Sequence, residues 1–199
     1  MQSNTDQNTE PNKGGTKPPL ENHEGSSLSS LNERKKGGIL SRVSIGKCAL
    51  FIGVALIWFA LDMATKAYAN SFERGEVFAG PFAGLFQFRL AHNTGAAWSM
   101  FSGSTFALAI LALVVLVVLV AIVALFSRRI TWLEAFSLGL VFAGGIGNAL
   151  DRFTLGYVVD FIQTIFISFP TFNVADIGVT CGVLIFALSF VLRTFSQKS

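Results

Sequence analysis

The chain has 199 residues, of which 52% are hydrophobic and only 14% are charged. Soluble domains carry about 25% charged residues, so this composition argues against an ordinary soluble domain and favours a chain that is partly solvated by lipid. The net charge of +3 is not evidence for a nucleic-acid partner, because the basic residues stand beside apolar runs, where they act as topology signals or contact anionic lipid.

Residues 1–38 are rich in Asn, Ser, Gly, Lys, Glu and Pro. Such a segment lacks the apolar surface that would offset the entropy lost on ordering. We therefore expect a disordered cytoplasmic tail that is dispensable for chemistry, followed by one membrane domain at 39–199.

Four apolar runs in this domain are long enough to cross a bilayer, which takes about 20 residues of helix. The runs are residues 48–69, 105–126, 132–150 and 174–195. The second run is unbroken, whereas the other three contain polar residues, which a membrane helix tolerates mainly where they face protein or a watery cavity. The sequence thus predicts an all-α membrane protein with four transmembrane helices.

Lysine and arginine indicate the orientation of these helices, because they are enriched in cytoplasmic segments. They stand before the first run, between the second and third runs, and after the fourth: Arg34, Lys35, Lys36, Arg42, Lys47, Arg128, Arg129, Arg193 and Lys198. Both termini should therefore be cytoplasmic, and the segments 70–104 and 151–173 should be extracytoplasmic.

The two extracytoplasmic segments contain strand patterns. Residues 86–90 alternate apolar and polar side chains, and residues 156–165 are rich in β-branched and aromatic ones. Gly80-Pro81 and Gly84 are typical of turns. We expect a small extracytoplasmic β-sheet resting on the membrane surface.

Asp62 and Lys66 lie four residues apart in the first run, which places them on one helix face with the acid N-terminal to the base. Burying either charge alone is costly, and pairing lowers that cost. Two interpretations remain open: a structural pair near the outer interface, or a pair beside a functional site.

More polar residues gather at the predicted outer side. Asn93 precedes the second run, where it could cap a turn or orient a substrate amide. Asn148 and Arg152 are four residues apart at the end of the third run and share a helix face, with Asp151 beside them. Helix packing explains the glycines nearby, but it does not explain this group of polar side chains.

Asp160 stands among apolar neighbours, while Asn173 and Asp176 open the fourth run. An Asn with an Asp three residues later is a common helix start, so capping alone could explain Asp176. Asp160 has no such local explanation. Two carboxylates held close together cannot both ionise easily, so one stays protonated while the other activates water, as in aspartic peptidases.

Other chemistries find little support in the sequence. The only histidines are His23 and His92, so we expect no metal site and no cofactor. Cys48 and Cys181 both lie in apolar runs, which predicts no structural disulfide. No serine or cysteine stands convincingly beside a basic partner, so carboxylates remain as the reactive groups.

Two non-peptidase interpretations are open at this point. A transporter or proton-conducting subunit would distribute its polar residues through the full membrane depth, but here the cytoplasmic halves of the runs nearly lack them. A non-catalytic assembly subunit would not need carboxylates at two separate places.

Five blocks, in order among the four runs, resemble the lipoprotein signal peptidases, also called signal peptidase II. The blocks are Asp62-x-x-x-Lys66, Asn93-x-Gly95-Ala96-Ala97, Gly147-Asn148-x-x-Asp151-Arg152, Val158-Val159-Asp160-Phe161 and Phe172-Asn173-x-Ala175-Asp176. The resemblance covers about residues 45–195. One departure is Ile177, where the family commonly has Ser.

The resemblance implies an aspartic endopeptidase in the bacterial cytoplasmic (inner) membrane, and we expect it to be a monomer. Such enzymes remove the signal peptide from diacylglyceryl-modified prolipoproteins, at the bond before the lipidated cysteine and at the extracytoplasmic interface. By motif position, Asp160 and Asp176 match the catalytic aspartates. The positions that match supporting or substrate-binding residues are Asp62, Lys66, Asn93, Asn148, Arg152 and Asn173. The implied fold is four helices, a small outer sheet and a surface helix.

Overall fold

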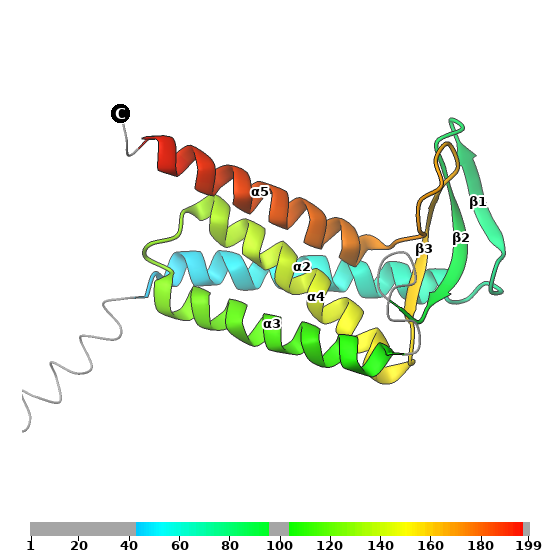
Figure 1. The fold of residues 1–199 in the computed structure, drawn as a ribbon, viewed down its shortest axis with the longest axis horizontal. Coiled ribbons are helices and arrows are strands. Elements are labelled where there is room, and N and C mark those ends of the chain that lie inside the picture. The colour runs from blue at the N-terminus through cyan, green and yellow to red at the C-terminus, as the bar shows by residue number, and fades with distance from the viewer. Residues whose placement is uncertain (1–42, 96–103, 197–199) are drawn as a thin grey trace, which may run out of the picture. The chain divides into compact units, whose positions relative to one another are not determined.

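The computed structural model describes residues 43–95 and 104–196, all within one compact unit, Leu40–Ser199. The predicted tail, residues 1–38, lies outside the described residues. The elements in chain order are α2 (Ile45–Ala69), β1 (Val77–Phe82), β2 (Phe86–Asn93), α3 (Thr105–Phe126), α4 (Trp132–Thr154), β3 (Val158–Thr164) and α5 (Val174–Ser196). Figure 1 shows the helices side by side, with the strands gathered at one end, which is called here the sheet end.

All four helices are long and apolar enough to cross a membrane, which confirms the predicted four-span fold. Their bounds differ from the expected runs by more than one residue in two places. Helix α2 begins at Ile45 rather than at residue 48, and α4 ends at Thr154 rather than at residue 150. The extension of α4 carries its polar C-terminal residues in regular helix. The described residues contain no further helix, so the surface helix implied by the resemblance is not among them.

Helix α4 lies at the centre of the bundle and packs against α2, α3 and α5. Its glycines allow close approach of the neighbouring backbones. A Cβ atom at Gly139 would stand 2.8 Å from the carbonyl oxygen of Phe51, and one at Gly144 would overlap the carbonyl oxygen of Ala175. The second contact holds the first turn of α5 directly against α4.

The sheet has three antiparallel strands in the order β1-β2-β3. Strands β2 and β3 correspond to the two predicted strand segments. The prediction of a turn at Gly80-Pro81 was wrong, because both residues lie within β1. Strand β1 is an edge strand, where a proline can be accommodated without breaking a ladder on both sides. The turn between β1 and β2 instead contains Gly84, as predicted, with a φ of 71°.

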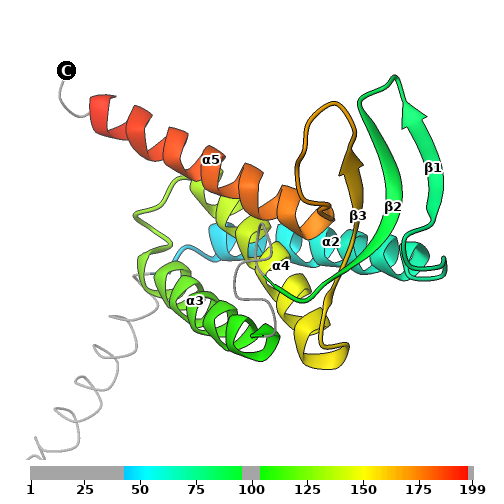
Figure 2. The same ribbon diagram turned by 45° about the vertical axis from the view of Figure 1, so that its right-hand side comes forward.

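One side of the sheet packs against the end of α2. Leu90, Val159 and Phe161 form a buried cluster with Ala69 at the end of α2, which fixes the sheet to that helix. A register shift between Phe88 and Ala91 interrupts the alternation of side chains along β2. Figure 2 shows β3 as the strand nearest the beginning of α5 and β1 as the outermost strand.

At the end of the bundle away from the sheet, α4 begins with a reciprocal cap. The Thr131 hydroxyl accepts a hydrogen bond from the Glu134 backbone N–H, and the Glu134 carboxylate accepts one from the Thr131 backbone N–H. Arg193 of α5 donates to the same carboxylate at 3.1 Å. This network ties the two helices together far from the residues proposed for chemistry.

Candidate active site

Asp160 lies in the middle of β3 and is only 2% exposed. Both of its carboxylate oxygens accept hydrogen bonds from asparagine amides. Asn173 Nδ2 donates to Oδ1 at 2.7 Å, and Asn93 Nδ2 donates to Oδ2 at 2.9 Å. The amides come from the start of α5 and the end of β2, so the carboxylate is held from two sides.

Asp176 lies in the first turn of α5. Its Oδ2 atom accepts a hydrogen bond from the Asn173 backbone N–H at 3.1 Å, and Asn173 Oδ1 accepts one from the Asp176 backbone N–H at 3.0 Å. The capping interpretation of this pair is thus confirmed. Capping uses only one carboxylate oxygen, and the other, Oδ1, accepts from Asn148 Nδ2 at 2.7 Å.

A chain of amide hydrogen bonds connects the two aspartates. Asn173 Nδ2 bonds both Asp160 and, at 3.1 Å, Asn148 Oδ1, while Asn148 Nδ2 bonds Asp176. A hydrogen-bond network of this kind restricts the rotation of each member. The two carboxylates, which come from different elements, are therefore positioned by one shared set of contacts.

Lys66 lies beneath this network and is 3% exposed. Its Nζ atom lies 2.9 Å from Asp62 Oδ2, 3.0 Å from Asp151 Oδ2 and 2.9 Å from Asn148 Oδ1. The predicted pair with Asp62 is present. Both interpretations of the pair hold, because its two side chains are buried and because Lys66 also contacts the hydrogen-bond network of the two aspartates. Because the ammonium group can only donate, it keeps Asn148 Oδ1 toward itself and directs Nδ2 at Asp176.

Asp62 also supports the beginning of α5 directly. Its Oδ1 atom accepts a hydrogen bond from the Ala175 backbone N–H at 2.8 Å. The first N–H groups of a helix have no partner within the helix, and Asp62 satisfies one of them in the residue next to Asp176.

Asp151 has a role in this region that the sequence did not predict. Besides binding Lys66, its Oδ2 atom accepts a hydrogen bond from the Val159 backbone N–H at 3.1 Å. It therefore fixes β3 to α4 one residue before Asp160. A signal was available, because Asp151 lies three residues after Asn148 and shares its helix face.

Arg152 connects α4 to the segment that follows β2. It donates to the carbonyl oxygens of Asn148 and Gly95, both at 3.1 Å. The backbone N–H of Gly95 in turn donates to Asn93 Oδ1 at 3.0 Å. Arg152 thereby holds the loop that orients the Asn93 amide toward Asp160.

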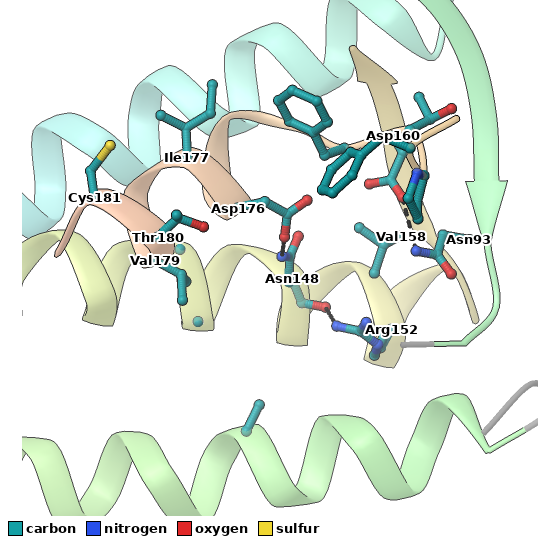
Figure 3. A pocket seen from close by; sticks show the side chains of 17 residues that line it. Asn93, Asn148, Arg152, Val158, Asp160, Asp176, Ile177, Val179, Thr180 and Cys181 are labelled. Atoms are coloured by element: carbon teal, nitrogen blue, oxygen red, sulfur yellow. Dashed lines mark hydrogen bonds between the residues drawn. The ribbon is translucent and has the colours of Figure 1, made fainter. Parts of the chain in front are cut away.

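The two aspartates line one cavity of about 650 Å³. Asn93, Asn148 and Arg152 line the same cavity, whose remaining wall is mostly apolar. In Figure 3, Asp160 and Asn93 lie at one end, Asp176 and Asn148 lie in the middle, and Cys181 of α5 lies at the other end. A ligand in this space would contact both carboxylates while extending along α5.

The electrostatics of the cavity favour one shared proton. Burial and the nearby negative charge of Asp176 together raise the pKa of Asp160 to about 7, against the hydrogen bonds from Asn93 and Asn173, which lower it. Two interacting carboxyl groups titrate as a pair. Near neutral pH, this pair can supply both a proton donor and a base.

The described residues contain no group of three or more His, Cys, Asp or Glu side chains arranged to hold a metal ion. Cys48 and Cys181 are both free thiols.

The structure brings the two predicted catalytic aspartates and the six predicted supporting residues into one connected region at the sheet end. This geometry offers acid–base chemistry by carboxylates.

Comparison with known proteins gives consistent matches. The family model described as "Signal peptidase (SPase) II" matches residues 54–192. The lipoprotein signal peptidase of Gloeothece citriformis is 39% identical over 149 residues, which cover 73% of this chain and 92% of that protein. The lipoprotein signal peptidase of Lactiplantibacillus plantarum is 38% identical over 144 residues, which cover 72% of this chain and 93% of that protein.

A solved structure described as a bacterial membrane enzyme, determined by the in meso method at 2.3 Å resolution, has the same fold. It aligns with a TM-score of 0.68 and 30% sequence identity, over 79% of this chain and 94% of the other. A second such structure, at 1.9 Å resolution, aligns with a TM-score of 0.63 and 30% identity, over 75% of this chain and 95% of the other. Together with the family match and the four apolar helices, these likenesses show that the chain belongs to the signal peptidase II family of membrane-embedded aspartic peptidases.

Proposed function

We propose that the chain is an intramembrane endopeptidase that removes the signal peptide from diacylglyceryl-modified prolipoproteins, with Asp160 and Asp176 as its catalytic pair. One observation carries the assignment of the pair: both carboxylates line the same cavity and are joined through Asn173 and Asn148. Membership of the signal peptidase II family supplies the reaction class.

In the proposed reaction, one carboxylate is ionised and the other is protonated. The ionised carboxylate takes a proton from water, whose oxygen attacks the carbonyl carbon before the lipidated cysteine, while the other carboxyl group donates its proton to the carbonyl oxygen. A proton then passes to the amide nitrogen as the C–N bond breaks. The products are a signal peptide with a free carboxylate and a lipidated cysteine with a free amino group.

We assign the resting proton to Asp160. The pKa of Asp160 is raised to about 7 by burial and by the charge of Asp176, so a large fraction of this group is protonated at neutral pH. With the shared proton on Asp160, Asp176 is the ionised member of the pair, and its two oxygens accept hydrogen bonds from the Asn173 backbone N–H and from Asn148. Asp160 would then act as the acid and Asp176 as the base.

The supporting residues act through the positions of these two groups. Asn93, Asn148 and Asn173 orient the carboxylates by direct hydrogen bonds. Lys66, with Asp62, orients Asn148 and the beginning of α5. The supporting and substrate-binding set is thus Asp62, Lys66, Asn93, Asn148, Arg152 and Asn173, without a metal or other cofactor.

We further propose that the enzyme works as a monomer in the bacterial inner membrane, with both termini in the cytoplasm and the sheet end outside. The α3–α4 connection, with Arg128 and Arg129, lies at the end of the bundle away from the sheet, and basic connections favour the cytoplasm. Labelling by a membrane-impermeant maleimide checks this orientation in a variant lacking Cys48 and Cys181. A cysteine in place of Glu73 should react in intact cells, and one in place of Arg129 should not.

The catalytic pair is tested with purified enzyme and a diacylglyceryl-modified prolipoprotein. Asp160→Asn and Asp176→Asn should each lower kcat by about 10³-fold or more, because each removes a proton-transfer group, while the folded protein persists. Glu134→Gln is a matched control, since Glu134 is a buried acid at the opposite end of the bundle. Appreciable turnover by both Asn variants would contradict the assignment of Asp160 and Asp176 as the catalytic pair.

A further inference from the structure

A second cavity, of about 520 Å³, lies on the small sheet. Its wall is mostly polar, and it is called here the glutamine groove. It is lined by Gln87 and Arg89 of β2, by Gln163 and Thr164 of β3, and by the loop that follows β3 as far as Phe169. None of these residues belongs to the catalytic network described above.

The glutamine groove lies close to Asp160 along β3, since Gln163 follows Asp160 by three residues on that strand. A register shift between Phe88 and Ala91 interrupts the alternation of side chains along β2, and beyond it Asn93 bonds Asp160. Gln87 is paired in register with Gln163. Phe88, the residue after Gln87, lines a separate apolar pocket beside α2.

The groove and the catalytic cavity meet at Phe169, which lines both of them. Their walls differ in character. The catalytic cavity extends along α5 to Cys181 between mostly apolar side chains, whereas amide and guanidinium groups surround the groove. A prolipoprotein has the same asymmetry, since its signal peptide and acyl chains are apolar and the chain after the lipidated cysteine enters water.

The glutamine pair at the floor of the groove suits an extended peptide backbone. Gln87 Nε2 donates to Gln163 Oε1 at 2.8 Å. Each side-chain amide has a donor and an acceptor group, so this bond leaves Gln87 Oε1 able to accept and Gln163 Nε2 able to donate. These two groups can bond a backbone N–H and a backbone C=O of a bound peptide, whatever its side chains are.

We propose that the glutamine groove binds the first residues of the mature lipoprotein, those that follow the lipidated cysteine. The inference rests on the proposed function and extends it to the leaving side of the scissile bond. Gln87 and Gln163 are then binding residues for the backbone of the mature segment. Such contacts accept many sequences, as a peptidase with many lipoprotein substrates requires.

The test compares two diacylglyceryl-modified substrates, one with a mature segment long enough to cross the groove and one that ends in an amide directly after the lipidated cysteine. The wild-type enzyme should cleave the long substrate with a kcat/KM about tenfold higher, as two net hydrogen bonds allow. The double variant Gln87→Leu/Gln163→Leu should lose this preference and keep its kcat/KM for the short substrate. Thr154→Ala, which lies outside both cavities, should keep the preference.

A third substrate tests the proposal without changing the protein. N-methylation of the backbone amides in the mature segment removes their N–H donors and should reduce the wild-type preference for the long substrate. Equal kcat/KM for the long and short substrates with the wild-type enzyme would contradict the proposed role of the groove. So would an equal loss of kcat/KM for both substrates in the double variant. Absence of wild-type cleavage of either substrate would count instead against the proposed function.

Discussion

The Lys66 ammonium group of α2 and the Asp151 carboxylate of α4 form an interhelical ion pair of 3.0 Å, with side chains only 3% and 8% exposed. Lys66 simultaneously pairs with Asp62, so one cation serves two buried acids. The hydrogen bond from Lys66 to Asn148 connects this charge cluster to the proposed catalytic pair. Its removal should therefore affect both stability and activity.

We expect Lys66→Met to lower the free energy of unfolding by about 3–5 kcal/mol, because Asp62 and Asp151 would remain buried without their cation. Thermal unfolding in detergent measures the effect. The triple variant Asp62→Asn/Lys66→Met/Asp151→Asn removes all three charges and should recover part of the loss. Glu73→Gln, at an exposed position, is the control, and an unchanged melting temperature for Lys66→Met would contradict the role of the cluster.

Gly147→Ala tests how closely α2 and α4 approach beside the site. A Cβ atom at Gly147 would overlap Asp62 Oδ2, so the carboxylate would have to move away from Lys66. Overpacking of this kind costs about 1–3 kcal/mol, and cleavage should fall as well. Gly53→Ala on α2 is a matched control, since nothing lies within 4 Å of a Cβ atom there; equal effects at the two positions would refute the explanation.

The pH dependence of cleavage should depend on Asn93. With the pKa of Asp160 raised to about 7, wild-type kcat/KM should fall above about pH 7, as the acid loses its proton. The Asn93 amide stabilises the ionised form of Asp160 and so lowers this pKa. Asn93→Ala should therefore move the alkaline limb to higher pH, and a shift to lower pH would contradict the assignment.

The same raised pKa has a consequence for stability. The ordinary pKa of an Asp is 3.8, and that of Asp160 in the folded protein is about 7. The folded state therefore binds this proton more tightly than the unfolded state, so the contribution of Asp160 to the free energy of unfolding declines as pH rises from about 4 to about 7. Unfolding measured across this range should show the decline in the wild type.

Deleting residues 1–38 should leave kcat/KM for the lipidated substrate unchanged. Every residue of the proposed catalytic pair and its supporting set lies from Asp62 onward, and the tail lacks the apolar surface needed for a packed core. The assay compares full-length and truncated enzyme at equal amounts of membrane-inserted protein. Loss of cleavage by a stably inserted truncation would show that the tail contributes to function.

Much of the fold could be predicted because it depends on local patterns. Long apolar runs define the helices, and alternation predicted β2 and β3 correctly. Strand β1 was missed because Gly80-Pro81 is typical of turns, and only its edge position in the sheet makes a proline acceptable there. The C-terminal end of α4 was predicted too early. The residues after Leu150 include polar ones and do not continue the apolar run, so the sequence does not indicate that they are still helical.

In the candidate site too, local contacts could be predicted from the sequence, whereas contacts between distant segments could not. Local spacing predicted the Asp62–Lys66 pair and the helix start at Asn173 and Asp176, both of which the structure contains. Spacing could not show that Lys66 also binds Asp151, because that contact depends on how closely α2 and α4 pack. The glutamine groove likewise needs the register of β2 against β3, which sequence patterns do not specify.

The central position of α4 also bears on how the protein enters the membrane. Of the four helices, α4 is the least apolar and the most enclosed by the others, and its C-terminal part carries Asp151 and Arg152. A charged carboxylate in a membrane helix is costly until it finds a partner. Because Lys66 is synthesised before Asp151, the counter-charge is already available on α2 when α4 emerges, so chain order itself provides a route for inserting the helix that carries the site.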